Sequence, residues 1–449
     1  MKDLETRYQE TLDWIYSWID FSMSRHVDES HRFFKLDRMN RLMALLDWPN
    51  RHYPCVHVAG TKGKGSTASF IASALRACGY KTGLYTSPHL EDFRERIQIN
   101  GEQISVSELV DLADQMRPRT EIVADVTTFE LTTAIAFQYF ANQQIDIAVL
   151  EVGLGGRLDA TNIVDPLVSV ITPISFDHMN VLGNTLTEIA QEKAGIIKPN
   201  RPVVIAPQHE EAEKEILRVA ASQNAPVTLA DKAYTWQILS HDINHQLIAI
   251  QQTDTNQQNP EQLTPVELDI PLLGRHQADN AATSLATLEI LRQSGFNITQ
   301  DDLKHGFQDV YWQTRFEVLR KEPPFIADAA HNGDSMQKLR QALDDYFPGL
   351  PFILLFGASA DKSLTTMLDI ILPRVEAVVC TQSIHPRAAD AFELQKLIEP
   401  YGIPVYAEVP AEAGLAKALE LAGDSKGIVA TGSLFLAAAA RAIWHQDYQ

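Results

Sequence analysis

The segment 56–67 joins a short apolar strand, a glycine-rich turn and the start of a helix. It reads Val-His-Val-Ala-Gly-Thr-Lys-Gly-Lys-Gly-Ser-Thr, and a helix-forming run, Ala68 to Cys78, follows at once. Glycines let backbone N–H groups turn toward one point, and a helix N-terminus adds partial positive charge there. Lys64 is placed to reach the outer phosphates of a nucleotide. The segment therefore predicts an α/β enzyme that uses a nucleoside triphosphate.

The spelling of this loop departs from the usual Walker sequence G-x-x-x-x-G-K-[ST]. Val58 occupies the position of the first glycine, and Gly65 that of the hydroxyl residue, so Ser66 comes one position late. The alternative is a glycine-rich strand-to-helix turn without a ligand, which recurs in α/β folds. The loop alone does not choose between the two, and other parts of the chain have to decide.

Length and charge favour a large enzyme without a nucleic-acid partner. The 449 residues exceed one ordinary core and indicate two or three domains. A net charge of −20 disfavours nucleic acid, whose phosphates require a basic surface. The three cysteines contain no C-x-x-C pair and indicate neither a disulfide framework nor zinc. No signal-peptide core is present and no apolar run approaches the roughly 20 residues of a membrane span, so a cytoplasmic enzyme is expected.

Strand and helix patterns alternate along most of the chain, which is typical of parallel strands joined by crossover helices. Two amphipathic helices are expected within 4–47, and the polar stretch 251–265 predicts an exposed loop. Strands of the first series are expected at 56–59, 82–86, 145–152, 167–173 and 203–206. Strands of a second, smaller series are expected at 325–327, 352–356, 377–380, 405–407 and 428–430. The predicted domains are residues 1–297 and 298–449, with a nucleotide held between them.

Four strands of the first series end in polar residues. The first leads into the glycine loop, the second into Thr86–His89, the third into Glu151 and a glycine turn, and the fourth into Asp177 and His178. Ligands of open α/β sheets bind beyond the carboxyl ends of the strands. Taken alone, His178 reads as an ordinary loop histidine. Convergence of four strands instead favours oxygen and imidazole groups around a Mg²⁺-nucleotide.

Lys193 lies inside the apolar stripe of a helix expected at 186–197. The helix opens with Thr185 and Glu188 at capping-box spacing. A lysine within such a stripe either extends outward to water or is buried with a perturbed amine. A buried neutral amine could react with CO₂ to form a carbamate, which turns a cation into an orienting anion. The residues by themselves leave both alternatives open.

These motifs together resemble folylpolyglutamate synthase/dihydrofolate synthase, a family of the Mur ligase superfamily. The loop Gly60–Ser66 is similar to the family's Gly-Thr-Asn-Gly-Lys-Gly-Ser, and the similarity extends over nearly the whole chain. The other matching segments are Thr86–Leu90 with Glu95 and Arg96, Thr128–Glu130, Glu151–Asn162, Asp177–His178, Glu192–Ile196, Asn280–Ala282, Arg315–Glu317, Asp328–Asn332 and Thr431–Ser433. The resemblance implies a P-loop domain of the Mur ligase central type with a mostly parallel sheet, and a smaller Rossmann-like α/β domain after it.

The resemblance also implies a role for each matching residue. The ATP phosphates would be bound by Gly60, Thr61, Lys62, Gly63, Lys64, Gly65 and Ser66. Further ATP contacts would come from Asn280, Arg315, Asp328 and His331. Mg²⁺ would be held by Ser87, Glu151 and His178 together with Lys193 as a carbamate, and a second Mg²⁺ and a monovalent cation are allowed. The pterin substrate would contact Thr128, Phe129, Glu130, Leu158, Asp159 and Ala160.

Two positions depart from the family's pattern. Lys62 replaces the usual Asn and places an extra cation beside the phosphates. Thr314 replaces the Gly that commonly precedes Arg315, which puts the geometry of that turn in question but leaves the arginine in place.

The implied reaction is ATP-dependent amide formation. A pteroate or folate carboxylate attacks the γ-phosphate to give an acyl phosphate, and the amine of L-glutamate then displaces phosphate. Lys64, Lys193, His178 and Arg315 are the expected catalytic residues, and closure of the domains around ATP is expected before chemistry. The expected partners are small molecules only, namely L-glutamate, reduced folate and dihydropteroate, and the chain is expected to act as a monomer without nucleic acid or membrane.

Three other functions compete with this one. A Mur-type peptidoglycan ligase usually carries an extra N-terminal domain, for which the 59 residues before Gly60 are too few. A P-loop ATPase or kinase would not require Lys193 or the segment Glu151–Asn162. A binding-only relative would not keep competent residues at every matching position. Within the family, Leu158–Ala160 matches members that also use dihydropteroate, whereas Ile19–Arg25, where that specificity is expected, is too divergent to align.

Overall fold

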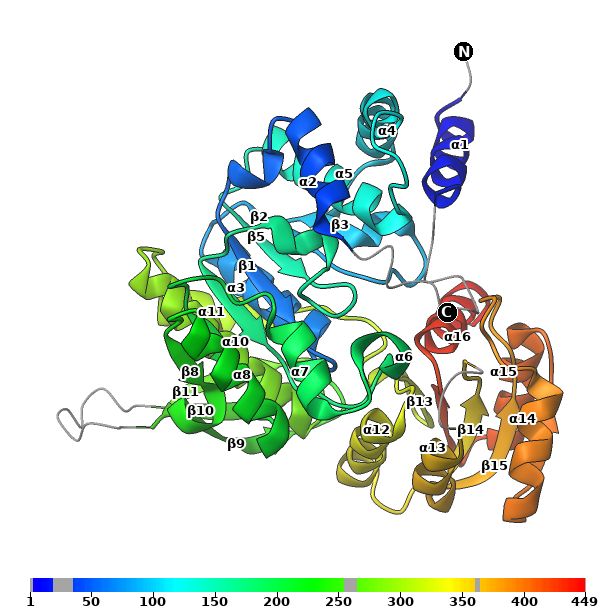
Figure 1. The fold of residues 1–449 in the computed structure, drawn as a ribbon. Coiled ribbons are helices and arrows are strands. Elements are labelled where there is room, and N and C mark those ends of the chain that lie inside the picture. The colour runs from blue at the N-terminus through cyan, green and yellow to red at the C-terminus, as the bar shows by residue number, and fades with distance from the viewer. Residues whose placement is uncertain (1–2, 19–34, 254–264, 360–363, 449) are drawn as a thin grey trace. The chain divides into compact units, whose positions relative to one another are not determined.

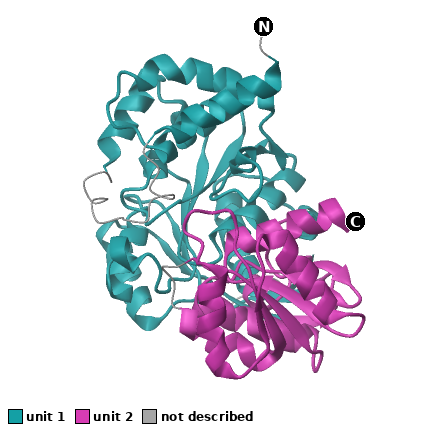
Figure 2. Cartoon of the chain, turned by 90° about the vertical axis from the view of Figure 1, so that its right-hand side faces the viewer, with its two compact units in different colours: residues 1–237, 248–269, 278–310 teal, residues 238–247, 270–277, 311–449 magenta. Residues whose placement is uncertain are grey.

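The computed structural model describes residues 3–18, 35–253, 265–359 and 364–448. They divide into two compact units, coloured separately in Figure 2. Unit 1 comprises Met1–Gln237, Ile248–Asp269 and Ala278–Val310, and unit 2 comprises Ile238–Leu247, Ile270–Gln277 and Tyr311–Gln449. The segment Ile19–Arg25 and most of the polar stretch 251–265 lie outside the described residues.

An eight-stranded, mostly parallel sheet is the centre of unit 1 (Figure 1). Its order is β4-β3-β2-β5-β1-β6-β7-β8, and only β3 and β4 run antiparallel to their neighbours. The strands are β1 (Cys55–Ala59), β2 (Thr82–Tyr85), β3 (Ile97–Ile99), β4 (Glu102–Gln103), β5 (Ile147–Glu151), β6 (Val168–Ile171), β7 (Val203–Ile205) and β8 (Val227–Leu229). The central strands β1 and β5 are buried along their full length, which explains their continuous apolar runs.

Helices cover both faces of this sheet. Cys55 and Ala59 lie on one face of β1. Cys55 packs into a core shared with α5, and Ala59 into a core shared with α7 and α8. Helix α3 packs against β1, β2 and β5, and α11 packs against α3. The longer helices of unit 1 are α1 (Leu4–Tyr16), α2 (Leu36–Leu45), α3 (Lys64–Ala77), α4 (Val106–Thr120), α5 (Thr128–Asn142), α7 (Leu186–Ala194), α8 (Glu210–Ser222), α10 (Arg275–Gln293) and α11 (Gln300–Gln308). The short helices are α6 (Met179–Leu182) and α9 (Ala230–Ala233). Helix α10 begins in unit 2.

A separate three-stranded sheet follows unit 1's large sheet in the chain. Its order is β11-β10-β9, with β9 (Tyr234–His241), β10 (Gln246–Gln252) and β11 (Val266–Ile270). The strands β10 and β11 flank the polar stretch that is expected to form an exposed loop.

Unit 2 contains a six-stranded sheet of order β12-β13-β17-β14-β15-β16. Alternate residues of β14 enter different cores: Phe352, Leu354 and Phe356 on one face, Ile353 and Leu355 on the other. Its strands are β12 (Glu317–Lys321), β13 (Pro324–Ala327), β14 (Phe352–Phe356), β15 (Val375–Cys380), β16 (Val405–Ala407) and β17 (Gly427–Thr431), and only β12 is antiparallel. Its helices are α12 (Gly333–Tyr346), α13 (Leu364–Ile371), α14 (Ala391–Ile398), α15 (Ala411–Ala422) and α16 (Leu434–Asp447).

The predicted fold class is confirmed: both units are α/β, and their sheets are mostly parallel. Each strand predicted in the two series is present to within about two residues at either end. The helix predicted at 186–197 ends earlier, at Ala194. In the part of the chain that the structure describes, every helix is too short or too polar to cross a bilayer.

Candidate functional site

The glycine loop lies between β1 and α3 and is fixed by the neighbouring strand β6. The N–H groups of Thr61 and Lys62 both donate to the Pro173 carbonyl, at 3.0 and 3.1 Å, and the Thr61 hydroxyl donates to the Ser175 carbonyl. Gly63 is the N-cap residue of α3 and has φ +80°, a left-handed conformation that glycine adopts readily. The predicted strand, loop and helix are therefore confirmed, and hydrogen bonds to the segment after β6 hold the loop.

Two glycines of the loop are required by close neighbours. A Cβ on Gly60 would lie 1.9 Å from the Thr172 hydroxyl oxygen, and a Cβ on Gly63 would lie 2.4 Å from Asn280 Oδ1. Side chains at either position would force these neighbours apart. Asn280, which is buried on α10, is thereby brought directly against the loop, as expected for a residue of the same site.

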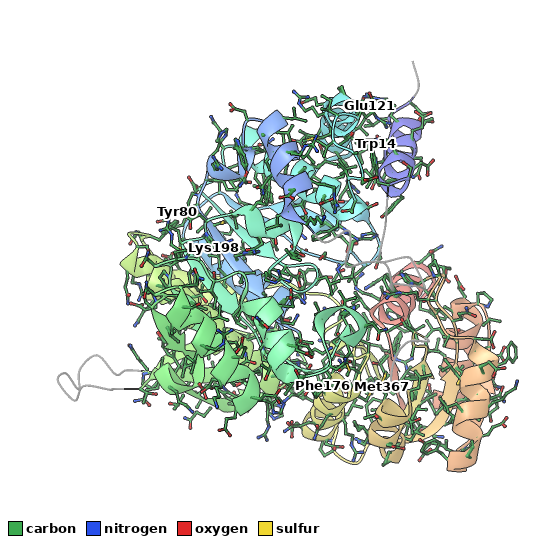
Figure 3. All side chains as sticks on the ribbon, in the orientation of Figure 1. Trp14, Tyr80, Glu121, Phe176, Lys198 and Met367 are labelled. Atoms are coloured by element: carbon green, nitrogen blue, oxygen red, sulfur yellow. The ribbon has the colours of Figure 1, made fainter. Side chains whose placement is uncertain are left out.

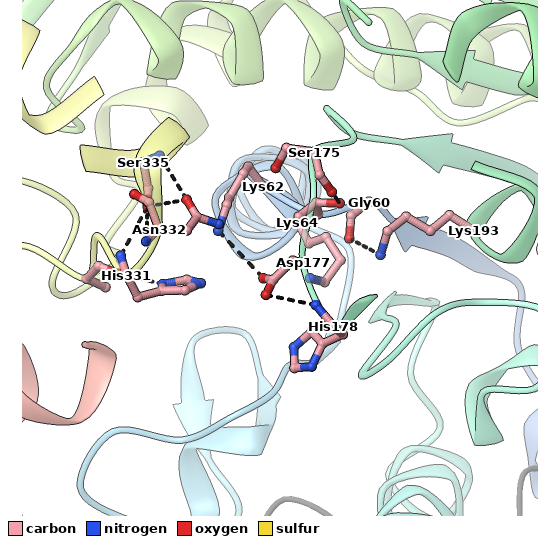
Figure 4. Close-up of polar contacts among 12 residues, drawn as sticks. Gly60, Lys62, Lys64, Ser175, Asp177, His178, Lys193, His331, Asn332 and Ser335 are labelled. Atoms are coloured by element: carbon pink, nitrogen blue, oxygen red, sulfur yellow. Dashed lines mark hydrogen bonds and ion pairs between the residues drawn. The ribbon is translucent and has the colours of Figure 1, made fainter. Parts of the chain in front are cut away.

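Lys193 is buried at the end of α7, and its amine donates to the Gly60 carbonyl at 2.9 Å (Figure 4). Only 5% of the residue is exposed, so of the two alternatives left by the sequence, burial is the one observed. Burial, with smaller contributions from the charges of Lys64 and Lys62, lowers the pKa of Lys193 to about 7, and the negative charge of Asp177 opposes the shift. A substantial fraction of the amine is therefore neutral near pH 7.

The carboxyl end of β5 brings a second charged pair to the loop. Glu151 is buried, its Oε2 accepts from the Ser87 N–H at 3.2 Å, and its Oε1 lies 3.9 Å from the Lys64 amine. Strands β2 and β5 are neighbours, which explains why Ser87 and Glu151 meet. The predicted convergence of β1, β2, β5 and β6 is confirmed by their adjacent places in the sheet.

The segment after β6 faces the same loop. Asp177 Oδ2 lies 3.8 Å from the Lys62 amine, and Asp177 Oδ1 accepts from the His178 N–H at 3.0 Å (Figure 4). His178 has φ +50°, a left-handed conformation that is uncommon outside glycine, and its side chain is exposed. Its imidazole is therefore accessible to a ligand.

The segment Glu151–Asn162 forms a tight loop held by one buried carboxylate. Asp159 accepts from the N–H groups of Gly153, Leu154 and Thr161 and from the Thr161 hydroxyl, at 2.5–3.1 Å. Burial raises the pKa of Asp159 despite these hydrogen bonds. Ala160 is buried beside it and Leu158 is half-buried. All hydrogen bonds found for the Asp159 carboxylate lie within its own loop.

This loop packs on the end of α7 and places Lys193. A Cβ on Gly156 would lie 2.8 Å from the carbonyl oxygens of both Glu192 and Lys193, and a Cβ on Gly195 would lie 2.4 Å from the Arg157 Cβ. Asn162 donates to the carbonyls of Arg157 and Gly195. At Gly195, the C-cap residue of α7, only glycine fits against Arg157.

The pterin candidates at the start of α5 have structural partners. The Thr128 hydroxyl donates to the carbonyls of Ile15 and Trp18, and Glu130 accepts from Arg38 and from the Thr127 N–H. Phe129 lies over Gly153, where a Cβ would come within 2.5 Å of its ring. These contacts tie α1 and α2 to α5, and Phe129 to the loop after β5.

In unit 2, Arg315 and Asp328 meet at a strained turn. Thr314 and Phe316 both have positive φ, at 55° and 52°, and the glycine expected before Arg315 would relieve the strain at Thr314. Asp328 accepts from the N–H groups of Phe316 and Ala330, at 2.8 and 2.9 Å, and burial raises its pKa to about 6. The turn keeps the geometry of a glycine position although a β-branched residue occupies it.

His331 follows Asp328 at the start of α12. The backbone N–H of His331 donates to the Ser335 hydroxyl. Its imidazole Nδ1 lies 2.8 Å from the Ala329 carbonyl oxygen, which leaves Nε2 as the outer ring nitrogen (Figure 4). Asn332 caps α12 through Ser335. Within unit 2, Asp328 thus contacts the turn that carries Arg315, and His331 follows Asp328 by three residues; their role in binding ATP stays a prediction.

Residues suited to Mg²⁺ are present, although a conventional cluster is absent. Over residues 3–18, 35–253, 265–359 and 364–448, no three His, Cys, Asp or Glu side chains gather closely enough to hold a metal ion. The candidate set differs in that it includes a serine hydroxyl and a lysine carbamate. Glu151 and Ser87 are adjacent, and hard oxygen donors of this kind are the ligands that Mg²⁺ prefers. The donor chemistry therefore fits magnesium.

A buried relay under the site was not predicted from the sequence. His57 of β1 is fully buried, and its Nε2 lies 2.8 Å from the hydroxyl oxygen of Thr161, which donates to Asp159. Burial lowers the pKa of His57 to about 3, so the imidazole is neutral and its Nε2–H donates to Thr161. The signal in the sequence was a histidine inside an otherwise apolar buried strand.

Lys198 is a second residue that sequence reasoning missed. Its amine donates to the backbone and side-chain oxygens of Asn162, both at 2.8 Å, and the residue, labelled in Figure 3, belongs to unit 1. These two hydrogen bonds hold Asn162, the last residue of the Glu151–Asn162 loop. Nothing in the spacing of Lys198 distinguishes it from a surface lysine.

Comparison with known proteins gives matches over both units. Residues 58–288 match the Mur ligase middle domain, and residues 314–434 match the Mur ligase glutamate ligase domain. Dihydrofolate synthase/folylpolyglutamate synthase of Bacillus subtilis is 36% identical, with 87% of this chain and 88% of that protein covered. Folylpolyglutamate synthase of Lacticaseibacillus casei is 32% identical, with 97% and 98% covered. The structure of Mycobacterium tuberculosis folylpolyglutamate synthase complexed with ADP matches all of both chains, with a TM-score of 0.87 and 32% identity.

Proposed function

The chain belongs to the folylpolyglutamate synthase/dihydrofolate synthase family of Mur ligases and is an acid–amino-acid ligase that uses ATP, and we propose that it joins L-glutamate both to reduced folates and to dihydropteroate. The observation that carries the proposal is the buried Lys193 amine on the Gly60 carbonyl, beside a loop lysine that faces Glu151. A plain P-loop ATPase needs no lysine buried behind its phosphate loop.

The loop residues supply binding and charge compensation in this reaction. N–H groups at the start of α3 and the Lys64 amine would bind the β- and γ-phosphates, and Arg315 would offset charge on the transferring phosphoryl group. Ser87, Glu151 and His178 would hold Mg²⁺, which when bound would supply positive charge to offset that of the phosphates. Positioning by these groups is the main protein contribution to phosphoryl transfer.

The reaction would proceed in two displacements. A carboxylate oxygen of the folate attacks the γ-phosphorus, the bond to the ADP oxygen breaks, and an acyl phosphate forms. The neutral amine of glutamate then attacks the acyl carbon, inorganic phosphate leaves with the bonding electrons, and the amine proton passes to solvent or to a nearby base. The chain's residues hold the anions together, because two negatively charged substrates otherwise repel each other.

Lys193 is proposed to act as a carbamate. The neutral fraction of its amine near pH 7 is the form that attacks CO₂, with loss of one proton and formation of an N–C bond. The product is an anion beside the loop lysines. The lysines would compensate its charge, and the carbamate would orient the metal site. Burial of the amine supports this role.

The use of dihydropteroate rests on a narrower observation. Leu158, Asp159 and Ala160 match the pattern of family members that act on it, and relatives of similar identity carry either one activity or two in their names. Leu158 is half-buried whereas Asp159 and Ala160 are buried, and we therefore propose Leu158 as the one of the three that would touch the pterin. The cytoplasmic location and the monomeric state expected from the sequence stay predictions.

ADP release measured under four conditions tests the proposal. With ATP and L-glutamate present, we expect ADP release when either tetrahydrofolate or dihydropteroate is added, and none when glutamate or the pterin is left out. ADP release with tetrahydrofolate but not with dihydropteroate would mean that the protein only adds further glutamates to folates. Release without an amine acceptor, or with a UDP-sugar peptide, would reject the folate reaction.

A further inference from the structure

Lys62 is the loop residue at which this chain departs from the family's asparagine, and it faces one carboxylate. Its amine lies 3.8 Å from Asp177 Oδ2, with 18% of the Lys62 side chain and 11% of the Asp177 side chain exposed. The base of Lys62 is fixed, because its N–H donates to the Pro173 carbonyl. Its amine is carried by four methylene groups and can change partner without movement of the loop.

The contact between Lys62 and Asp177 is looser than a strong ion pair. A charge-assisted hydrogen bond joins nitrogen and oxygen at about 2.7–2.9 Å, well below the separation observed here. Two charges that have largely left water without close contact recover only part of their desolvation cost. A doubly charged phosphate group near the same amine would therefore compete successfully with the carboxylate.

The charges around the loop are paired, so a cation for an arriving anion has to come from an existing pair. Lys62, Lys64 and Lys193 lie around the loop, and Asp177 and Glu151 are the carboxylates paired with the first two. The charge of Lys62 reaches the buried amine, since it is one of the causes that lower the pKa of Lys193, after burial and Lys64. With Lys193 as the neutral amine the five groups sum to zero charge, and as the carbamate to one negative charge, so an arriving phosphate has to take Lys62 from Asp177 to gain a cation.

We propose that Lys62 exchanges partners during turnover: it contacts Asp177 when no γ-phosphate is bound, and it binds the γ-phosphate of ATP in preference to Asp177. The inference rests on the proposed use of ATP by this loop. Its consequence is discrimination between nucleotides, because only the triphosphate extends to the Lys62 amine. Loss of the γ-phosphoryl group would return Lys62 to Asp177 and favour release of ADP.

The competing role is a static brace. In that role the pair only ties the loop to the segment after β6, and its removal would weaken the fold and the binding of ATP and ADP alike. Lys62→Asn, which restores the family's residue, separates the two roles, and Asp177→Asn removes the competitor. Lys214→Asn is the matched control, because Lys214 is exposed on α8 and the change in net charge is the same.

Calorimetric binding of ADP and of the β,γ-methylene analogue of ATP, with Mg²⁺ and with EDTA, tests the exchange. We expect Lys62→Asn to weaken the analogue about tenfold and ADP less than twofold, and Asp177→Asn to strengthen the analogue about threefold only while Lys62 is present. An equal loss of affinity for both nucleotides in Lys62→Asn would overturn the exchange. Additive effects on affinity when Lys62→Asn and Asp177→Asn are combined would also overturn it. Thermal unfolding of each variant identifies loss of fold.

The nucleotide measurements do not depend on the amide-forming reaction. If wild-type protein releases no ADP with glutamate and a pterin, the proposed function fails, whatever the binding data show. If wild-type protein is active but the preference for the analogue is unchanged in Lys62→Asn, only the exchange fails. The two failures are therefore distinguishable.

Discussion

Lys193 shows how one residue acquires its chemistry from its surroundings. It lies in the apolar stripe of α7, contacts the Gly60 carbonyl and has two loop lysines nearby. Burial and the two loop lysines disfavour the ammonium form relative to the amine, whereas the Gly60 carbonyl can accept a hydrogen bond from either form. The same amine on an exposed helix face would be an ordinary cation.

Lys193→Met should lower turnover about 10²-fold, because the methionine cannot form the orienting anion at the metal site. Steady-state ADP release at saturating ATP, folate and glutamate measures the effect. Lys214→Met on α8 removes the same charge from an exposed position and should leave turnover unchanged. Turnover near the wild-type rate in Lys193→Met would remove Lys193 from the reaction.

Stability should depend on pH through the same residue. The pKa of Lys193 is about 7 in the folded chain and has its ordinary value near 10.5 in the unfolded chain. Between these values the unfolded state binds the additional proton, so the free energy of unfolding rises with pH across that window. Below pH 7 the cost of burying the cation is fully present. Urea unfolding in CO₂-free buffer measures the free energy of unfolding of wild type and Lys193→Met at each pH. The difference between the two proteins should shrink from pH 7 to pH 10, and a difference that stays constant with pH would contradict this.

Among the elements, the loop after β5 and the helix α7 act as one structural piece. Asp159 holds the loop from within, and Gly156 and Gly195 allow backbone to approach backbone. The relay from His57 through Thr161 connects the loop to β1, which carries the phosphate loop. The position of the Lys193 amine is therefore set by three elements that are distant in sequence.

Gly156→Ala should abolish most of the turnover while the chain still folds. Its Cβ would meet backbone atoms of Glu192 and Lys193 at 2.8–3.0 Å, so α7 has to move and carries Lys193 with it. Gly79→Ala is the control: it has φ +86° but open space, and should cost only about 1 kcal/mol of backbone strain with normal turnover. ADP release and urea midpoints of the two variants measure the contrast. Similar turnover in both would show that α7 tolerates the displacement.

In the whole molecule, candidate residues are distributed over both units. Unit 1 carries the phosphate loop, Glu151 and Lys193, and unit 2 carries Arg315 and Asp328. If all of them act on one ATP molecule, as the resemblance implies, binding has to bring the units into a defined arrangement.

The radius of gyration should therefore decrease when ATP and pteroate are added together. Small-angle scattering of the full chain with no ligand, with ADP alone, and with both substrates measures this change. Arg315→Ala should bind nucleotide at the loop but show a smaller decrease, because it removes one of the unit 2 contacts. Equal compactness under all three conditions would contradict closure.

Much of the fold and of the candidate site could be predicted from local pattern. Buried parallel strands require continuous apolar runs, and the glycines at 60 and 63 mark a loop in which side chains have no room. Since parallel strands end at one edge of a sheet, the polar residues after β1, β2, β5 and β6 could be assigned to one site before their spatial order was known. The strands β3, β4, β8 and β12 escaped prediction. The first three have only two or three residues, too few for a periodic pattern, and β12 is an edge strand in which charged residues interrupt the apolar ones.

What could not be predicted depends on contacts between distant segments. Whether Lys193 is buried, where Asp159 directs its hydrogen bonds and which carboxylate faces Lys62 are set by elements that are up to 133 residues apart in the chain. Side-chain type and spacing determine which groups are available, and they specified the phosphate loop, the sheet and the family. Burial and charge environment arise only when the chain is packed, and they determine which of these groups is a neutral amine, a fixed carboxylate or a cation ready to change partner.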